Sequence, residues 1–418
     1  MKILFPYLAR WHSANRSRYH QLLLHLCAFG HQVHVLTAPP KALSDISATD
    51  IIGGNDDLPA GLTISELHAP NLLRRFWRVP VPGTKLLKKG LVSISSINQI
   101  RRFIAKEKID VLMLYNLPQA PLLHLPGLPK LPKLMDVDCR THFDLADDLV
   151  AMMEVELGRV AKAGAMTAAR SVQNHMIAKA GTVTVASSVL EEQIERNVLM
   201  LPNGADITDL DQADGSAWRA RNKGPTVGFV GAFEYWVDFD LVQQAARALP
   251  LVTFLLVGGG RRWQTVKQQV EKLGLRNVKL TGAMPYQEAM NYVAGMDVCL
   301  LPFTRDAVSD GSCPLKLFEY AALRKPIVST NTREVARIGQ GWIAFADDPA
   351  DFAAAIESFL TDERAATHAG EAGRAMVEQL YNWPNLTRQF EELLLKGAVP
   401  QVELTSARRS VLGTLESE

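Results

Sequence analysis

Long apolar runs are missing from this sequence of 418 residues. No stretch approaches the roughly 18 consecutive apolar residues that a membrane-spanning helix needs. The N-terminal segment MKILFPYLARWHS has one lysine and then an apolar run that Pro6 interrupts and Arg10 ends, which is too short for the core of a signal peptide. We therefore expect neither a spanning helix nor a secretory leader.

Cysteine and net charge are also scarce. The four cysteines are widely separated and form no C-x-x-C pair, so the sequence predicts no zinc site and no disulfide framework, and it is typical of a reducing cytoplasm. Lys and Arg number 45 against 44 Asp and Glu, so overall charge gives no reason to expect a nucleic-acid partner. The 47% of hydrophobic residues are enough to fill the cores of two domains.

Short β-rich segments alternate with helical patterns along nearly the whole chain, and the series occurs twice. KILFPYL, HQVHVLTA, DVLMLYN and KLMDVD are strand candidates of the first half, and TVGFVGAF, LVTFLLVGG and DVCLLPF belong to the second. This alternation indicates βαβ units with parallel strands. The predicted fold class is α/β, with two doubly wound Rossmann-like domains whose sheets face a central cleft.

The domain limits follow from turn signals and composition. We predict an N-terminal domain over residues 1–200, a C-terminal domain over 201–380, a helix over 381–396 that crosses back to the N-terminal domain, and a flexible tail over 397–418. Ligands of such sheets bind where strands end and helices begin, so functional residues should lie in the loops that face the cleft.

The stretch CPLKLFEYAALRKPIVST, residues 313–330, reads as a helix followed by a strand. Ser312 and Pro314 suit a helix start, where free N–H groups attract phosphate. Lys316 and Glu319 are three residues apart and share a helix face, so the lysine can meet a diphosphate and the glutamate can accept hydrogen bonds from two ribose hydroxyls. An exposed ion pair is the alternative, with a contribution of about 0.2–0.5 kcal/mol.

Two strand candidates of the second half end in glycine. Gly228 and Gly231 lie in the first of them, and LLVGGG, residues 255–260, ends the second. Glycine at a strand end allows the phosphates of a ligand to approach the backbone, although tight packing of strand on helix would explain these glycines equally well.

The order of these motifs resembles the nucleotide-binding domain of GT-B glycosyltransferases, most closely those of family four, also called group one. The resemblance covers residues 180–390 well, and it extends more loosely to RYHQLLLHLCAFGHQVHVLT and to MLPNGAD in the first half. It implies a nucleotide-sugar donor, with uridine as the default base, bound by the C-terminal domain, and an acceptor bound by the N-terminal domain. It does not identify the sugar.

The resemblance also assigns individual donor-binding residues. Glu319 matches the family's ribose-binding glutamate, Lys316 lies where these enzymes often contact the distal phosphate, and Gly231 matches the glycine beside the diphosphate. Residues 280–283, which include Gly282, correspond to the loop that reads the nucleobase. With Ser312 at the helix start, Lys316 would neutralise the leaving group, so we predict a catalytic role for Lys316, no metal and no cofactor.

Two positions depart from the family pattern. Relatives commonly carry a second acidic residue where this chain has Gly311, and Asp310, one residue earlier, is the candidate substitute. Many retaining members carry a histidine where this chain has Asn116, which we keep as an acceptor-binding candidate.

The loop after the first strand, ARWHSANRSRYH, has no glycine pair of the kind found in many relatives. His12, Arg16 and Arg18 are candidates for binding the acceptor, since arginine forms forked hydrogen bonds with phosphate. A solvated loop is the alternative.

The segment LMDVDCRTHFDLADD contains Asp136 and Asp138, which look like a metal-binding DxD motif. GT-B enzymes normally require no metal, so the resemblance argues against a metal site at this pair. Asp138 or His142 at this predicted strand end would project into the cleft, where a general base must stand if the enzyme inverts the anomeric centre. Asp138 could equally cap the following helix.

Basic and aromatic side chains are interleaved in residues 71–110. This pattern favours a peripheral contact with an anionic membrane surface, although single-stranded nucleic acid or a solvated helix face would use the same residue types. The candidates are Arg74, Arg75, Trp77, Arg78, Lys85, Lys88 and Lys89.

The favoured interpretation is a cytoplasmic glycosyltransferase at the inner face of the membrane, which moves a sugar to a hydroxyl of a glycan or lipid-linked glycan in polysaccharide or glycolipid biosynthesis, without a nucleic-acid partner. A nucleotide-sugar epimerase on the same fold and a non-catalytic nucleotide-sugar-binding or scaffold subunit are the alternatives.

Overall fold

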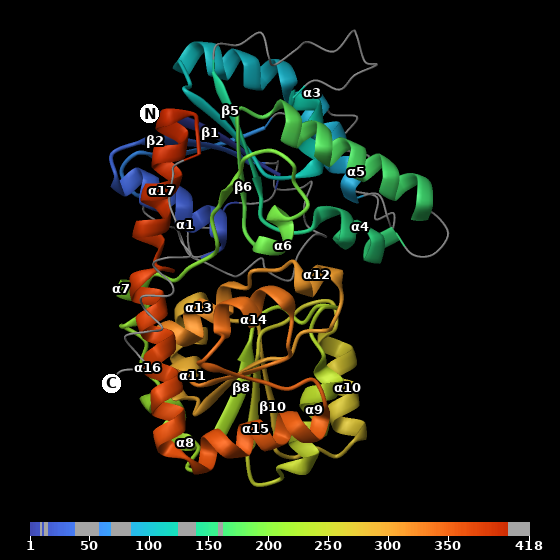
Figure 1. The fold of residues 1–418 in the computed structure, drawn as a ribbon, viewed down its shortest axis with the longest axis vertical. Helices are drawn as coiled ribbons and strands as arrows, with labels where there is room; N and C mark the ends of the chain where they lie inside the picture. The colour runs from blue at the N-terminus through green and yellow to red at the C-terminus, as the bar shows by residue number, and fades with distance from the viewer. Residues whose placement is uncertain are drawn as a thin grey trace.

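The computed structural model describes residues 1–8, 11, 16–37, 58–67, 85–123, 139–157 and 162–399. Two parallel sheets lie one above the other, each flanked by helices (Figure 1). The predicted fold class, α/β with two Rossmann-like domains, is therefore confirmed. His12, Asp138, Arg74, Arg75, Trp77 and Arg78 lie outside the described residues.

The N-terminal sheet has the strand order β3-β2-β1-β4-β5-β6-β7, and every pair is parallel. Its strands are β1 (Lys2–Tyr7), β2 (Gln32–Thr37), β3 (Leu62–Glu66), β4 (Val111–Leu114), β5 (Arg140–Leu145), β6 (Thr182–Val185) and β7 (Leu199–Met200). Alternate residues fill the two faces: Ile3 and Phe5 belong to one core cluster, and Leu4 belongs to the other. This sheet is consequently buried on both sides, which is usual for parallel strands.

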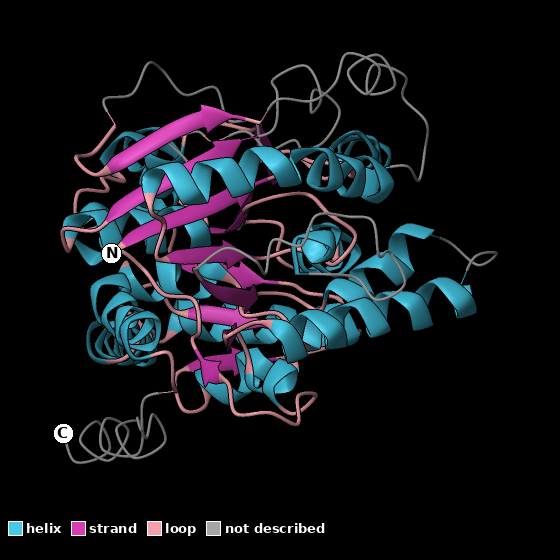
Figure 2. Cartoon of the chain, turned by 90° about the horizontal axis from the view of Figure 1, so that it is seen from above, coloured by secondary structure: helices cyan, strands magenta, loops and turns pink. Residues whose placement is uncertain are grey.

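Helices cover both faces of that sheet, as the view from above shows (Figure 2). They are α1 (Arg18–Ala28), α3 (Lys85–Glu107), the 3₁₀ helix η2 (Leu117–Leu123), α4 (Leu149–Leu157), α5 (Lys162–Lys179) and α6 (Ser188–Glu191). Gly30, with φ +89°, turns the chain from α1 into β2. Lys85, Lys88 and Lys89 lie in α3, but their side chains are outside the described part of the chain.

The C-terminal sheet repeats the same winding, with the order β10-β9-β8-β11-β12-β13. Its strands are β8 (Thr226–Val230), β9 (Thr253–Val257), β10 (Val278–Gly282), β11 (Val298–Leu301), β12 (Ile327–Ser329) and β13 (Ile343–Phe345). Its helices are α7 (Ile207–Leu210), α8 (Ser216–Arg221), α9 (Phe239–Ala248), α10 (Trp263–Lys272), α11 (Tyr286–Gly295), α12 (Ala307–Asp310), α13 (Leu315–Ala322), α14 (Arg333–Gly339), α15 (Pro349–Thr361) and α16 (Glu363–Gln379). The order reverses between β8 and β11, so ligands are expected at the ends of these strands.

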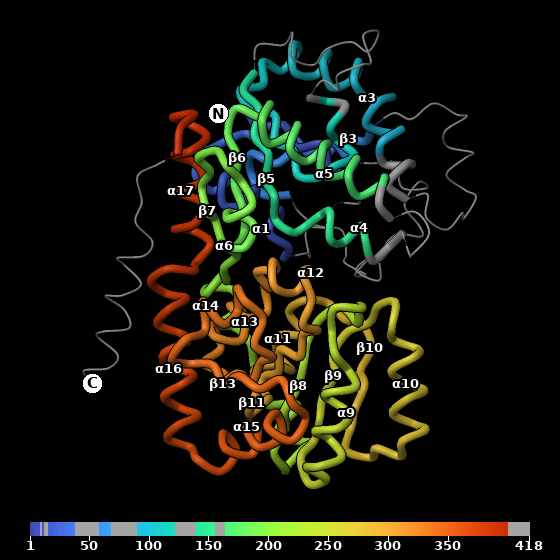
Figure 3. The backbone as a smooth tube through the Cα atoms, turned by 45° about the vertical axis from the view of Figure 1, so that its right-hand side comes forward, coloured from blue at the N-terminus to red at the C-terminus, as the bar shows by residue number. Residues whose placement is uncertain are grey.

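The last helix, α17 (Trp383–Lys396), returns to the N-terminal domain. Trp383, Leu386 and Phe390 are buried in the same core cluster as Leu22 and Leu26 of α1. In Figure 3, α16 runs beside the lower sheet and α17 beside the upper one. Among the described residues, none of the helices is both long enough and apolar enough to cross a bilayer.

Candidate functional site

A cavity of about 350 Å³ lies where the ends of β8 and β9 face the N-terminal domain, a volume within the range usual for ligand pockets. Both domains contribute to its lining. Its lining includes Arg16 and Ser17 from the N-terminal domain and Gly231, Gly258, Tyr286, Lys316 and Glu319 from the C-terminal domain. The structure thus brings the predicted residues Gly231, Lys316 and Glu319 into one space.

Two glycine turns form the floor of this cavity. Gly231 and Gly258 have φ angles of +149° and +132°, in the region that favours glycine. A Cβ on Gly258 would lie 2.0 Å from the carbonyl oxygen of Gly231, and a Cβ on Gly231 would lie 2.7 Å from Cε of Lys316. The N–H of Gly231 donates to Val257, so Gly231 contributes close approach of the backbone and not a donor.

Lys316 crosses the Gly231 turn from the first turn of α13. Its Nζ lies 5.3 Å from the ring centroid of Phe229 and 5.7 Å from that of Phe303, within cation–π range. Burial lowers the pKa of Lys316, and Glu319 partly opposes this. Lys316 and Glu319 influence each other's charge, but the structure records no ion pair between them among the described residues, so the simple surface pair does not form.

Glu319, one turn further along α13, faces the same cavity. Its carboxylate accepts a hydrogen bond from the Tyr286 hydroxyl. Burial raises the pKa of Glu319, while Lys316 and the Tyr286 hydrogen bond lower it in part. A carboxylate that accepts one hydrogen bond still has lone pairs with which it can accept hydrogen bonds from a ligand.

Arg16 enters the cavity from the N-terminal domain. Its Nε donates to Asp209 of α7 at 3.0 Å, which ties the start of α1 to the other domain. Arg16 was predicted to bind the acceptor, and the structure places it on the same cavity as Lys316 and Glu319.

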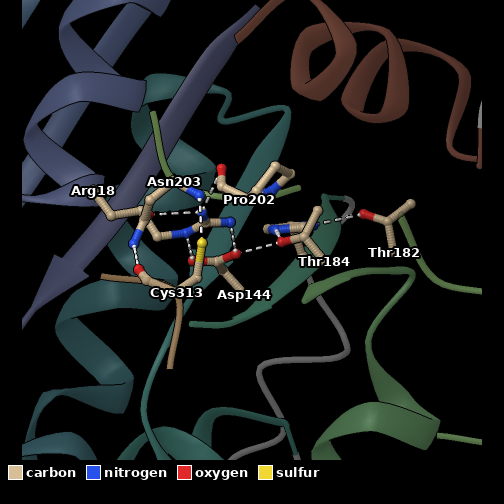
Figure 4. Close-up of polar contacts among 8 residues, drawn as sticks. Arg18, Asp144, Thr182, Thr184, Pro202, Asn203 and Cys313 are labelled. Carbon is tan, nitrogen blue, oxygen red and sulfur yellow. Dashed lines mark hydrogen bonds and ion pairs between the residues drawn. The ribbon is translucent and has the colours of Figure 1, made fainter. Parts of the chain in front are cut away.

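Arg18, the second predicted acceptor residue, is buried in a polar cluster (Figure 4). Its Nε and Nη2 donate to the two oxygens of Asp144, both at 2.8 Å, and its Nη1 donates to Pro202 and Asn203. Asn203 in turn donates to the carbonyl of Cys313, just before α13. Burial alone would raise the pKa of Asp144, but Arg18 outweighs it and holds that pKa below its usual range. Arg18 therefore stabilises the junction between the two domains.

His142 requires a correction. We expected it beyond a strand KLMDVD, but the described strand is Arg140–Leu145, so His142 lies inside β5. It has no exposed surface, its two ring nitrogens bond to Thr182 and Thr184, and its ring packs against Phe390. Burial lowers the pKa of His142 to about 4. A side chain so enclosed has no path to an acceptor hydroxyl.

Ser312 and Asp310 also differ from expectation. The residue that caps α13 is Pro314, and no side chain closes that helix start. Ser312 instead lines a neighbouring cavity. Asp310 accepts a hydrogen bond from the N–H of Arg333, at the start of α14, and lies outside the residues that line either cavity. Asp310, the candidate substitute for the acidic group missing at Gly311, thus holds the start of α14 in this structure.

Gly282 and Asn116 are the remaining predicted site residues. Gly282 has φ +85°, and its carbonyl accepts from Gly258, which joins the β10 loop to the glycine floor. Asn116 follows β4, and its N–H donates to the side chain of Gln119. Asn116 is not among the residues that line the two cavities.

Sequence reasoning missed Asp147 and Trp236, which line the neighbouring cavity of about 320 Å³. The sequence signal for Asp147 is FDLADD, in which an acidic pair follows the end of a strand. Trp236 sits in a turn after β8 whose path no local pattern indicates.

Two domains of the same winding, with a cavity lined from both at the ends of their strands, define the GT-B class. Two family models match the chain: a glycosyl transferase 4-like domain over residues 16–204 and glycosyl transferases group 1 over residues 224–362. The chain belongs to the group 1 glycosyltransferases.

Known proteins agree with this family. TuaH of Bacillus subtilis (strain 168), whose name assigns it to teichuronic acid biosynthesis as a glycosyltransferase, is 31% identical over 171 residues, 40% of this chain and 42% of that relative's length. Sucrose-phosphate synthase (tll1590) from Thermosynechococcus elongatus has a TM-score of 0.74 at 17% identity, over 94% of this chain and 98% of its own. Anabaena Alr3699/HepE, solved with UDP, has a TM-score of 0.62 at 15% identity, over 95% and 100%. The two solved structures establish the shared fold.

Proposed function

We propose that this protein transfers a sugar from a nucleoside diphosphate sugar to a hydroxyl of a glycan or lipid-linked glycan. The observation that supports this most is the convergence of Gly231, Lys316 and Glu319 on one cavity between the domains. A glycine floor, a cation and a carboxylate together match the diphosphate and the ribose of such a donor.

Each group has a part in this proposal. Glu319 accepts hydrogen bonds from two ribose hydroxyls, and Lys316 neutralises the charge that develops on the leaving diphosphate. The start of α13, which no side chain caps, adds its dipole beside Lys316. These groups supply the stabilisation without a metal ion, and we propose metal-independent transfer.

The nucleotide and the pathway are proposals as well. UDP is the nucleotide in the Anabaena structure of the same fold, which supports uridine as the first base to test. The relative TuaH supports polysaccharide biosynthesis. For a lipid-linked acceptor, we propose that the basic segment with Arg74, Arg75 and Arg78 holds the protein at the cytoplasmic face of an anionic membrane. Changing these three arginines to glutamate should abolish binding to anionic liposomes, and a wild type that never binds them would contradict the idea.

The first experiment is a calorimetric screen against UDP, GDP, ADP, dTDP and CMP, without metal and then with magnesium. Selective binding of one diphosphate without metal, followed by sugar transfer from the matching donor, supports the proposal. Binding that needs magnesium would overturn metal independence. No binding to any of the five would contradict the donor site and favour a non-catalytic scaffold.

A further inference from the structure

A second cavity, of about 320 Å³, adjoins the proposed donor cavity. Ser17, Leu315 and Lys316 line both cavities, so the two spaces meet beside the lysine. If Lys316 binds the distal phosphate, as proposed above, the group attached to that phosphate extends into the second cavity. The inference below rests on that proposed function.

Three aspartates surround the junction of β5 and α4, and they have different partners. Asp144 is fully buried and paired with Arg18. Asp148 accepts from the N–H of Ala151 and so caps α4. The Asp147 carboxylate forms no hydrogen bond with the described residues, is exposed to solvent and lines the second cavity. Asp147 is thus the one of the three whose acceptor oxygens are available.

The surroundings of Asp147 suit a polyhydroxylated ring. Trp236 lines the same cavity from the C-terminal domain and offers an apolar surface to the C–H face of a sugar, while a carboxylate can accept from two neighbouring hydroxyls.

Contacts between the domains surround the segment that follows Asp147. The Ser187 hydroxyl donates to the carbonyl of Gly311 at 2.7 Å. A Cβ on Gly311 would lie 3.8 Å from Cβ of Asp148 and 3.9 Å from Cδ2 of Leu190. The start of α4 therefore packs directly against the C-terminal segment that leads to α13, and Asp147, one residue before Asp148, lines the same cavity as Lys316.

We propose that Asp147 determines which sugar is transferred, by accepting hydrogen bonds from hydroxyl groups of the donor's sugar ring in the second cavity. The N-terminal domain thereby supplies the carboxylate that reads the sugar, and the C-terminal domain binds the nucleotide.

The test compares the affinity for the diphosphate that binds in the screen, UDP first, with the affinities for its glucose, galactose and N-acetylglucosamine derivatives. In the wild type, one derivative should bind at least about tenfold more tightly than the diphosphate alone, as expected for a hydrogen bond to a charged group. Asp147→Asn and Asp147→Ala should lose this gain while diphosphate affinity stays unchanged. Asp148→Asn is the control: it removes one negative charge from the neighbouring residue. It should keep the gain in affinity, because asparagine also caps helices.

Three results are decisive. If Asp147→Ala retains the full gain, or if no sugar adds affinity in the wild type, the inference is overturned and the nucleotide site stands. If Asp148→Asn loses the gain as Asp147→Asn does, local disturbance explains both variants and the inference is overturned. If the wild type binds no nucleotide at all, the proposed function fails and the inference fails with it.

Discussion

The two sides of the cleft use their charged residues differently. On the N-terminal side, Arg18 and Asp144 are buried against each other. All three nitrogens of the Arg18 guanidinium donate hydrogen bonds to protein acceptors. On the C-terminal side, Lys316 and Glu319 line an open cavity and form no ion pair with each other among the described residues. The first side therefore holds the domains together, and the second is left available for a ligand.

The largest expected effect tests the first side. Arg18→Ala would leave Asp144 charged and buried without its partner, and such a loss costs about 3–5 kcal/mol of unfolding free energy. Arg16→Ala is the matched control, because the Arg16–Asp209 pair is partly exposed and such pairs contribute less than about 1 kcal/mol. Urea denaturation of both variants measures the difference. Equal losses of unfolding free energy in the two variants would contradict a special stabilising role for Arg18.

Glu319→Gln tests the second side. The change should weaken binding of the diphosphate by about 1.5–3 kcal/mol, or roughly tenfold to hundredfold, because hydrogen bonds from ribose to a charged acceptor are lost. Stability should stay close to the wild-type value, since burial already raises the pKa of this carboxyl and its charge is not required for folding. Calorimetry and urea denaturation separate the two effects, and unchanged affinity would refute the ribose assignment.

This contrast also explains what the sequence could predict. The alternating strands are local patterns, so the fold class could be predicted from them. The glycine ends and the Lys316–Glu319 spacing, read with the family resemblance, brought together residues that line one cavity. The pairing of Arg18 with Asp144 could not be predicted, because the two residues are 126 positions apart and no local pattern connects them. His142 was misplaced because the predicted strand KLMDVD ends seven residues before β5 does. Both KLMDVD and RTHFDL contain apolar residues, so the pattern does not decide between them.

A pH series sharpens the comparison. Burial lowers the pKa of Lys316, so the cation should be lost at a lower pH than in an ordinary lysine, and nucleotide affinity should then fall up to about tenfold per pH unit. Burial raises the pKa of Glu319, so on the acid side the carboxylate is lost as pH falls through a value above the usual one, and affinity should decrease there too. In Lys316→Gln the alkaline decline should disappear. Its persistence would show that another group titrates.

The smallest expected effect concerns Tyr286 of α11, whose hydroxyl donates a hydrogen bond to Glu319. Tyr286→Phe removes the hydroxyl that donates to Glu319 but keeps the ring, so the carboxylate loses one neutral hydrogen bond of about 0.5–1.5 kcal/mol. Without that donor the pKa of Glu319 should rise further, and the acid decline in affinity should move to higher pH. Tyr292→Phe, on the same helix, is the matched control and should leave the profile unchanged. If Tyr286→Phe weakens binding equally at every pH, the hydroxyl contacts the ligand directly and does not act through Glu319.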